Sequence, residues 1–267
     1  MVKMLDHIDI IKVGTDVLVQ EDRTGVRGLN QFAFRRVGRQ LSGEGNNVLV
    51  TSAAIAAGMA VTRTKSRPDA ASEMPELQRQ ASVGWLPIMS AWNQAIRRKN
   101  IGSVLLTRQE LDQEAEERDE ALRVIHTLLK HGEVPVINEN DVIRHDEITF
   151  GDNDILAATL AACMARSPLF GKVRLFMMSS VNGVYEDVDD PRSRIPVIED
   201  TASQRHLALE TDSVNGTGGM ISKFDAADIA GPAGVDIWIL DPRSGSHRNR
   251  AVRGEIGTYF PARAVEL

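Results

Sequence analysis

Short apolar runs alternate with amphipathic segments along most of this chain. Continuous runs rich in Val, Ile and Leu are typical of buried strands, and six of them predict strands over 8–13, 48–50, 103–106, 134–137, 173–178 and 235–240. Apolar residues at spacings of three and four predict the intervening helices, one from an Asn30 cap to Leu41 and others over 55–61, 76–99, 114–130, 153–164 and 221–230. Pro87 is expected to kink the longest helix, and 147–150 is expected to form a short strand.

This alternation predicts the fold class. Strands that are apolar throughout belong to a sheet that is covered on both faces. We therefore expect an α/β protein with a mostly parallel central sheet and helices on both faces, an α/β/α sandwich. In such sheets, ligands bind outside the carboxyl ends of the strands. The polar clusters that directly follow predicted strands are thus the candidates for a functional site.

Composition narrows the class of protein further. The 267 residues are 42% hydrophobic, which suits one large domain or two small ones. The net charge of −6, without a strongly basic segment, argues against nucleic acid as a partner. No apolar run reaches transmembrane length and no leader pattern opens the chain, so we expect no membrane association. Cys163 is the single cysteine, and the reducing cytoplasm is the expected compartment.

Two predicted strand ends carry groups suited to binding an anion. Lys12 lies near the end of a strand that is otherwise expected to be buried, and Gly14 behind it lets a phosphate approach the backbone. The alternative is a lysine whose ammonium group reaches the surface along a buried stem. Thr51 and Ser52 follow the second strand and open a helix, where hydroxyl and backbone N–H groups bind anions. Taken alone, these two hydroxyls are better explained as an ordinary helix cap.

Two clusters of acid and amide side chains flank the next part of the chain. Asn138–Asp141 directly follows the fourth strand, and Asp152–Asp154 stands at the start of a predicted helix. Buried polar groups need partners, and here the expected partner is a ligand. Helix capping and a tight turn are the structural alternatives, but two such clusters at strand exits favour a function. Together they could bind an α-amino group and a carboxylate, and an aspartate could orient lysines.

A glycine-rich segment, Asn215–Lys223, precedes the sixth predicted helix. Backbone N–H groups of such a loop can surround phosphate oxygens, and Lys223 in the first turn of the helix adds a fixed positive charge. The segment is neither a Walker A motif nor GxGxxG, and a flexible surface loop is the structural alternative. The sequence also contains no HExxH, CxxC or GxSxG motif, which disfavours zincin, redox and α/β-hydrolase functions.

Taken in order, these segments resemble the glutamate 5-kinases of the amino acid kinase family. The resemblance extends from about Ile10 to Phe260 and rests on Ile11–Thr15, Val50–Gly58, Leu105–Arg108, Val134–Asp141, Phe150–Asp154 and Gly216–Lys223. The combination of Ile-Asn-Glu-Asn-Asp, Gly-Asp-Asn-Asp and Gly-Thr-Gly-Gly-Met is more specific than any single motif. It favours these kinases over relatives that phosphorylate aspartate, acetylglutamate, carbamate or UMP.

The resemblance implies an activity and a set of site residues. The implied reaction transfers phosphate from ATP, with Mg²⁺, to the side-chain carboxylate of L-glutamate, which gives glutamyl 5-phosphate in the first step of proline biosynthesis. The implied catalytic residues are Lys12, Asp154 and Lys223, with Asp154 organising the two lysines. The implied glutamate-binding residues are Ser52, Asn138, Asp141, Asp152 and Asn153. The implied ATP-binding residues are Lys12, Gly14, Ser179, Ser180, Thr217, Gly218, Gly219, Met220, Ile221, Ser222 and Lys223.

The resemblance also implies an organisation of the chain. A single amino acid kinase domain is expected, in which residues 1 to about 165 bind the amino acid and residues from about 166 to 267 bind ATP. A homo-oligomer, either a dimer or a tetramer, and feedback inhibition by proline are expected as well. Many bacterial members carry a C-terminal PUA domain, and this chain, which ends at Leu267, is expected to be a form without one.

Two positions depart from the family pattern. Ala53 stands where glycine is usual after the serine, and Ser179-Ser180 replaces a Thr-Asp pair whose acid lies beside the nucleotide. These departures motivate two alternatives. One is a sensor with the kinase fold that binds an amino acid or a nucleotide with little turnover, and the other is a kinase for another small acid. The presence of both lysines and of Asp154 favours the active glutamate kinase.

Overall fold

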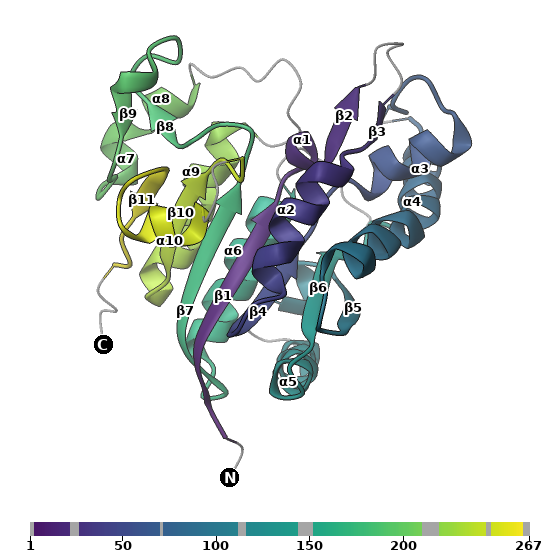
Figure 1. Ribbon diagram of the computed structural model, residues 1–267, viewed down its shortest axis with the longest axis horizontal. Coiled ribbons are helices and arrows are strands. Elements are labelled where there is room, and N and C mark those ends of the chain that lie inside the picture. Colours follow the sequence, from purple (N-terminus) through teal and green to yellow (C-terminus); the bar gives the residue numbers. More distant parts are fainter. Residues whose placement is uncertain are drawn as a thin grey trace.

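A parallel sheet forms the centre of the molecule. A computed structural model describes residues 3–21, 27–69, 72–111, 116–143, 152–209, 219–243 and 247–263. Within these ranges, seven strands form the sheet in the order β11-β10-β7-β1-β4-β6-β5 (Figure 1). Neighbouring strands are parallel except for β11, which runs antiparallel to β10. The predicted mostly parallel sheet is therefore confirmed.

The six predicted strands are all present. The strands of the sheet are β1 (Leu5–Val13), β4 (Asn46–Val50), β5 (Ile101–Leu106), β6 (Val134–Glu139), β7 (Phe170–Met178), β10 (Asp236–Leu240) and β11 (Thr258–Phe260). β1 lies between β4 and β7, and its Lys12 is in register with Val50 and Met177. The carboxyl ends of these three parallel strands consequently meet at one edge of the sheet.

Helices cover both faces of the sheet, as predicted. The longer helices are α2 (Gln31–Leu41), α3 (Ala54–Thr62), α4 (Met74–Ala95), α5 (Glu116–Lys130), α6 (Asp152–Arg166) and α9 (Met220–Ala230). Ile10 and Val50 belong to the apolar core that includes residues of α5, α6 and α9, whereas Ile11 and Leu49 belong to the core that includes residues of α2 and α4. This alternation follows from the two-residue period of a strand.

Several short elements were not predicted. They are α1 (Thr15–Leu18), β2 (Val19–Glu21), β3 (Arg27–Leu29), β8 (Val184–Tyr185), β9 (Arg194–Ile195), α7 (Thr201–Gln204), α8 (His206–Leu209), α10 (His247–Val252) and three 3-10 turns at Gln109–Leu111, Pro191–Ser193 and Gly231–Ala233. Figure 1 shows β8, β9, α7 and α8 together at one corner of the molecule. Each spans six residues or fewer, which is too short for hydrophobic periodicity to reveal.

Helix α4 ends earlier than predicted, at Ala95 rather than at residue 99. The chain becomes extended at Ile96, whose side chain is buried in the core beneath α2 and α4. Arg98 then takes the left-handed conformation, with φ of 71°. Burial of Ile96 therefore stops the helix where its amphipathic pattern would continue it. Pro87 lies inside α4, which continues through it.

Some predictions fall outside the described residues. The expected strand at 147–150 and nearly all of the expected loop at 211–219 lie there. The Asn30 cap is confirmed, because its Oδ1 accepts the N–H of Ala33 at 3.2 Å. In the described parts of the chain, every helix, α4 included, falls short of the combined length and apolarity needed to cross a bilayer.

Two glycines allow α3 and α4 to cross in close contact. A Cβ atom added to Gly58 would lie 1.9 Å from the carbonyl oxygen of Gln80, and one added to Gly84 would lie 1.8 Å from that of Ala54. No side chain fits at these distances, so backbone packs on backbone. Because α3 directly follows the end of β4, this crossing holds the turn that carries Ser52.

We expect Gly84→Ala to lower the free energy of unfolding by about 1–3 kcal/mol, because the added methyl group forces the two backbones apart. Chemical denaturation measures the change. Gly28→Ala is the control, since a Cβ there would meet nothing within 4 Å, and we expect its effect to stay within about 0.5 kcal/mol. Equal, small effects of both substitutions would contradict the close crossing.

Candidate active site

Lys12 places a positive charge at the carboxyl end of the central strand. Its side chain lies on the face covered by α6 and α9, and the residue is only 5% exposed. The ammonium group therefore does not reach the surface in the way the alternative interpretation required. A lysine buried in this way needs a negative partner.

That partner is Asp154, in the first turn of α6. Lys12 Nζ forms an ion pair with Asp154 Oδ1, and Lys223 Nζ from α9 lies 3.4 Å from Asp154 Oδ2. The hydroxyl of Ser222 donates to the same Oδ2 at 2.7 Å. Asp154 is fully buried, and both lysines are 5% exposed. The structure thus brings together all three residues predicted to be catalytic, from β1, α6 and α9.

The charges within this cluster keep Asp154 ionised. Burial alone raises the pKa of its carboxyl group, but the charges of Lys12 and Lys223 and the hydrogen bonds from Lys12 and Ser222 outweigh burial and lower the pKa to about 2. A carboxylate that is permanently charged at neutral pH orients the two ammonium groups and does not exchange protons with a substrate. The two lysines and Asp154 together carry one positive charge, which suits an anionic ligand.

The exit of β4 presents a hydroxyl group at this edge. Thr51 accepts a hydrogen bond from Trp92 Nε1 at 2.9 Å and is fully buried. The neighbouring Ser52 hydroxyl has no hydrogen-bond partner among the described residues. The turn continues through Ala53, which adopts φ of 76° and ψ of 12° and precedes α3. The backbone of this turn has the left-handed geometry that is usual for glycine, although the residue is alanine.

The two acid–amide clusters meet through their amides. Asn153 Nδ2 donates to Asn138 Oδ1 at 3.3 Å, and Asn153 Oδ1 accepts the backbone N–H of Glu139 at 3.2 Å. These bonds join the end of β6 to the start of α6. Asp141 is half-buried in the turn after β6. Asp152 is the first residue of α6, and its side chain lies outside what the structure describes.

Hydrogen bonds with Asp16 and Arg243 hold both backbone polar groups of Ser180, and we call this arrangement the clamp. It joins the exits of β1, β7 and β10 and was not predicted from the sequence. The Ser180 N–H donates to Asp16 Oδ2 at 2.9 Å, and its carbonyl accepts from Arg243 Nη2 at 2.7 Å. Arg243 is held in turn by Asp241, with a distance of 2.7 Å from Nε to Oδ2. Asp16 also lies against Gly14, where an added Cβ would meet its Oδ1 at 2.5 Å. The rule that polar residues after strands form sites, applied to β10, would have found Arg243.

The glycine-rich segment is described only in part. Thr217 and Gly218 lie outside the described residues. Gly219 precedes α9, and the side chains of Met220 and Ile221 pack against the apolar core. Only their backbone groups therefore remain for a ligand at this helix start.

Among the described side chains, no group of three or more His, Cys, Asp or Glu is arranged to hold a metal ion. Ser179, predicted near the nucleotide, is buried, and its N–H donates to the carbonyl of Leu240 at 3.0 Å.

The chain is similar to known kinases both in sequence and in fold. Residues 8–241 match the amino acid kinase family. The chain is 36% identical over 264 residues to the glutamate 5-kinase of Thermus thermophilus, an alignment that covers 95% of this chain and 67% of that protein. It is 33% identical to the glutamate 5-kinase of Nocardia farcinica, covering 97% of this chain and 68% of that one. The chain belongs to the amino acid kinase family.

Solved structures agree on the fold. Carbamate kinase from Giardia lamblia bound to AMP-PNP superposes with a TM-score of 0.62 at 16% identity, covering 98% of this chain and 99% of that chain. An isopentenyl phosphate kinase substrate complex also gives 0.62, at 15% identity, covering 95% of this chain and 99% of the other. At such low identity these similarities establish the architecture alone.

We expect Asp154→Asn to lower the free energy of unfolding at pH 7 by about 2 kcal/mol, the value of the pKa depression. The folded pKa of about 2 lies below the ordinary 3.8. The contribution is therefore fully present above pH 3.8 and is lost as the pH falls through about 2. Urea denaturation at a series of pH values measures it, with the exposed Asp189→Asn as control. A difference from the wild type that persists undiminished at pH 2 would contradict this assignment.

Proposed function

We propose that this protein catalyses ATP-dependent phosphorylation of the side-chain carboxylate of L-glutamate. The observation that carries the proposal is the buried Lys12–Asp154–Lys223 cluster at the carboxyl edge of the sheet. The similar proteins named glutamate 5-kinase support the choice of glutamate as acceptor. The product is L-glutamyl 5-phosphate, which places the reaction as the first step of proline biosynthesis.

The chemistry requires charge neutralisation rather than a base. The carboxylate of glutamate is already ionised at neutral pH, so its oxygen attacks the γ-phosphorus of ATP directly. A new carboxyl oxygen–phosphorus bond forms, the bond to the β-phosphate oxygen breaks, and ADP departs with the electron pair. Phosphoryl transfer depends mainly on positioning and electrostatic stabilisation. In our proposal, Lys12 and Lys223 bring the two anions together, and Asp154 holds both ammonium groups in place.

We assign the amino acid to the edge formed by β4 and β6. The Ser52 hydroxyl and the linked amides of Asn138 and Asn153 offer donors and acceptors for its carboxylate and amino groups. Asp141 and Asp152 complete this side by supplying negative charge for the ammonium group. In this proposal, residues 1 to about 165 carry the amino acid and the remainder carries the nucleotide.

We assign ATP to the edge formed by β1, β7 and α9. Gly14, Ser179 and Ser180 line the strand exits, and Gly219 to Lys223 form the start of α9. Thr217 and Gly218 are proposed to bind the nucleotide as well. Mg²⁺ is bound in proteins through few carboxylates and mostly through substrate phosphates. In our proposal the ion therefore arrives with ATP. When bound, it neutralises charge on the phosphates.

Release of ADP with a panel of acids tests the function. We expect release with glutamate and Mg²⁺-ATP, and little with aspartate, acetylglutamate or carbamate. ADP release with a different acid would identify that acid, and not glutamate, as the substrate. Thermal stabilisation by glutamate or ATP without ADP release would instead indicate a sensor.

Inhibition by proline, the oligomeric state and the cellular location are also proposals. Proline shares the α-carboxylate and amino nitrogen of glutamate, and we propose that it inhibits as the end product of the pathway. We further propose a homo-oligomer and a cytoplasmic location. Inhibition curves with proline and sedimentation of the purified chain test the first two directly.

We expect Lys223→Ala to lower kcat about 100-fold or more, because charge stabilisation of the transition state is lost. The ADP-release assay measures it. Lys130→Ala, at the exposed last residue of α5, is the matched control and should leave turnover unchanged. Near-normal activity of the Lys223 variant would remove this lysine from the catalytic assignment.

We expect Asp16→Asn to raise KM for ATP about threefold to tenfold while KM for glutamate stays unchanged. The substitution weakens a charge-assisted hydrogen bond to the Ser180 peptide, which belongs to the nucleotide side. Initial rates with each substrate varied in turn separate the two constants. Asp6→Asn, an exposed acid near the opposite end of β1, is the control. Equal increases in both KM values would argue for a general structural role.

A further inference from the structure

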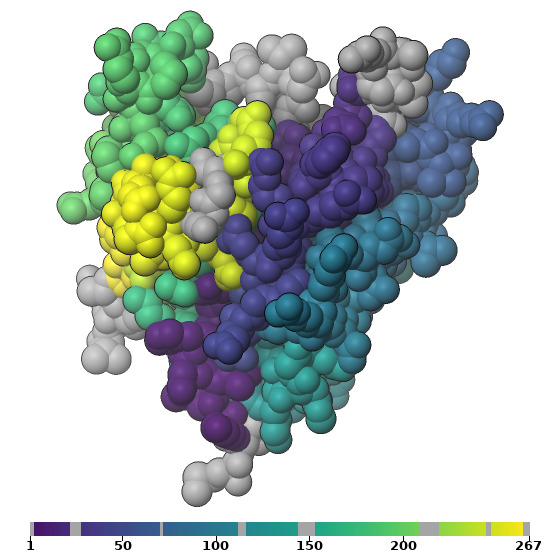
Figure 2. All heavy atoms as spheres, viewed as in Figure 1, coloured from purple at the N-terminus to yellow at the C-terminus, as the bar shows by residue number. Residues whose placement is uncertain are grey.

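A second polar site lies on the other face of β1, away from the proposed active site. Asp9 is three residues before Lys12, so it is about 10 Å along the strand and points to the opposite face. There, a hollow of about 440 Å³ opens between the end of α2, the start of β4 and α10. In Figure 2, residues near the C-terminus (yellow) lie beside the purple-to-indigo residues of the first part of the chain on this side of the molecule.

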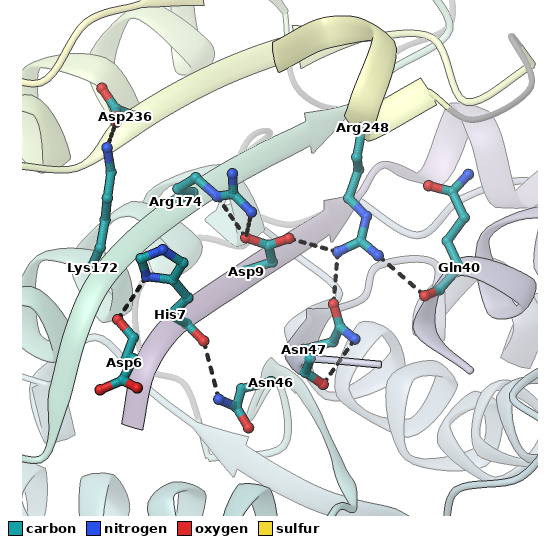
Figure 3. Close-up of polar contacts among 11 residues, drawn as sticks. Asp6, His7, Asp9, Gln40, Asn46, Asn47, Lys172, Arg174, Asp236 and Arg248 are labelled. Carbon is teal, nitrogen blue, oxygen red and sulfur yellow. Dashed lines mark hydrogen bonds and ion pairs between the residues drawn. The ribbon is translucent and has the colours of Figure 1, made fainter. Parts of the chain in front are cut away.

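Both carboxylate oxygens of Asp9 bind arginine side chains. Arg174 from β7 donates to Oδ1 at 2.8 Å through Nε and lies at 2.7 Å through Nη2. Arg248 from α10 donates to Oδ2 at 2.8 Å through Nη1. Figure 3 shows the carboxylate of Asp9 between these two guanidinium groups. One carboxylate therefore serves two cations, and one positive charge stays without a counter-charge in this cluster.

Neutral groups hold the second arginine in place without neutralising it. Arg248 Nη1 donates to Asn47 Oδ1 at 2.6 Å, and its Nη2 donates to the carbonyl oxygen of Gln40 at 3.1 Å (Figure 3). The side chain of Arg248 is only 14% exposed. Burial lowers the pKa of Arg248, Asp9 opposes this effect, and Arg174 lowers the pKa further. Burial and then the charge of Arg248 also lower the pKa of Lys99 nearby.

Donors remain available towards the hollow. Among the described residues, Nη1 of Arg174 and Nε of Arg248 have no hydrogen-bond partner. Arg39, which also lines the hollow from α2, forms no hydrogen bond or ion pair with any described residue. Three guanidinium groups from three separate elements thus line one cavity, which is also lined by the two carboxylates of Asp9 and Glu44, so the lining retains a net positive charge. Guanidinium groups bind the oxygens of phosphates and carboxylates through paired hydrogen bonds.

We propose that this hollow binds a small multivalent oxyanion, a phosphate or a dicarboxylate, held by Arg39, Arg174 and Arg248. The ligand supplies the negative charge that the Asp9 cluster lacks. It also joins α2 to β7 and α10, which connects elements of the amino-terminal part to elements of the carboxyl-terminal part. The site lies on the opposite face of β1 from the cluster of Lys12, Asp154 and Lys223, and the inference does not depend on the proposed reaction.

Titration calorimetry with inorganic phosphate, and separately with succinate, tests the proposal. We expect saturable binding of at least one anion to the wild type, weakened about tenfold or more by Arg39→Gln and by Arg174→Gln. The second substitution leaves Asp9 and Arg248 as a balanced pair. Arg35→Gln, an exposed arginine on the same helix that does not line the hollow, is the control and should bind normally. Lys223→Ala should retain this binding, which separates it from any anion at the proposed active site.

A stability measurement gives an independent readout. Asp9→Asn leaves two guanidinium groups without a carboxylate, so we expect a lower melting temperature that phosphate restores more strongly than it stabilises the wild type. Phosphate also stabilises proteins nonspecifically, and the Arg39→Gln variant measures that effect. Binding of phosphate alone identifies a phosphate ligand, and binding of succinate alone a dicarboxylate. Absence of saturable binding, or binding unchanged by both arginine substitutions, would overturn the proposal.

Discussion

Two buried lysines share one buried carboxylate, and the rest of the structure has to preserve that arrangement. Lys12, Asp154 and Lys223 come from β1, α6 and α9, and each is at most 5% exposed. Removing the shared carboxylate would leave two buried ammonium groups without compensation, which is unfavourable. The helices must therefore pack on the sheet in one relative position. Their alanine-rich contact, with side chains such as Ala158 and Ala227 in the same core, permits the close approach that these ion pairs require.

The sequence predicted the sheet, and through the family resemblance it predicted that Lys12, Asp154 and Lys223 lie together. Apolar runs identified six strands because both faces of a parallel sheet are buried, and Lys12 was conspicuous as the one charge at the end of such a run. The clamp between Asp16, Ser180 and Arg243 could not be predicted. Its three members are far apart in the chain, and the hydrogen bonds depend on the relative placement of β1, β7 and β10. The early end of α4 was missed for a similar reason, since it depends on burial of Ile96 against α2.

The structure shows the local environment of both positions that depart from the family pattern. Ala53 keeps the left-handed turn with φ of 76°, at a cost of roughly 1–2 kcal/mol for a residue with a side chain. Its methyl group is buried in the core beneath α2 and α4, which offsets part of this cost. At the second position, the Ser180 N–H donates to the carboxylate of Asp16 from α1.

The alternation of charge along β1 has a consequence for how the chain folds. Asp9 and Lys12 point to opposite faces, with Ile10 and Ile11 between them. A strand that slipped by one residue during folding would turn every side chain to the wrong face. Such a slip would move Lys12 away from Asp154 and Asp9 away from Arg174 and Arg248. A purely apolar strand would lack this penalty, so the two charges favour the native register of β1 over a register shifted by one residue.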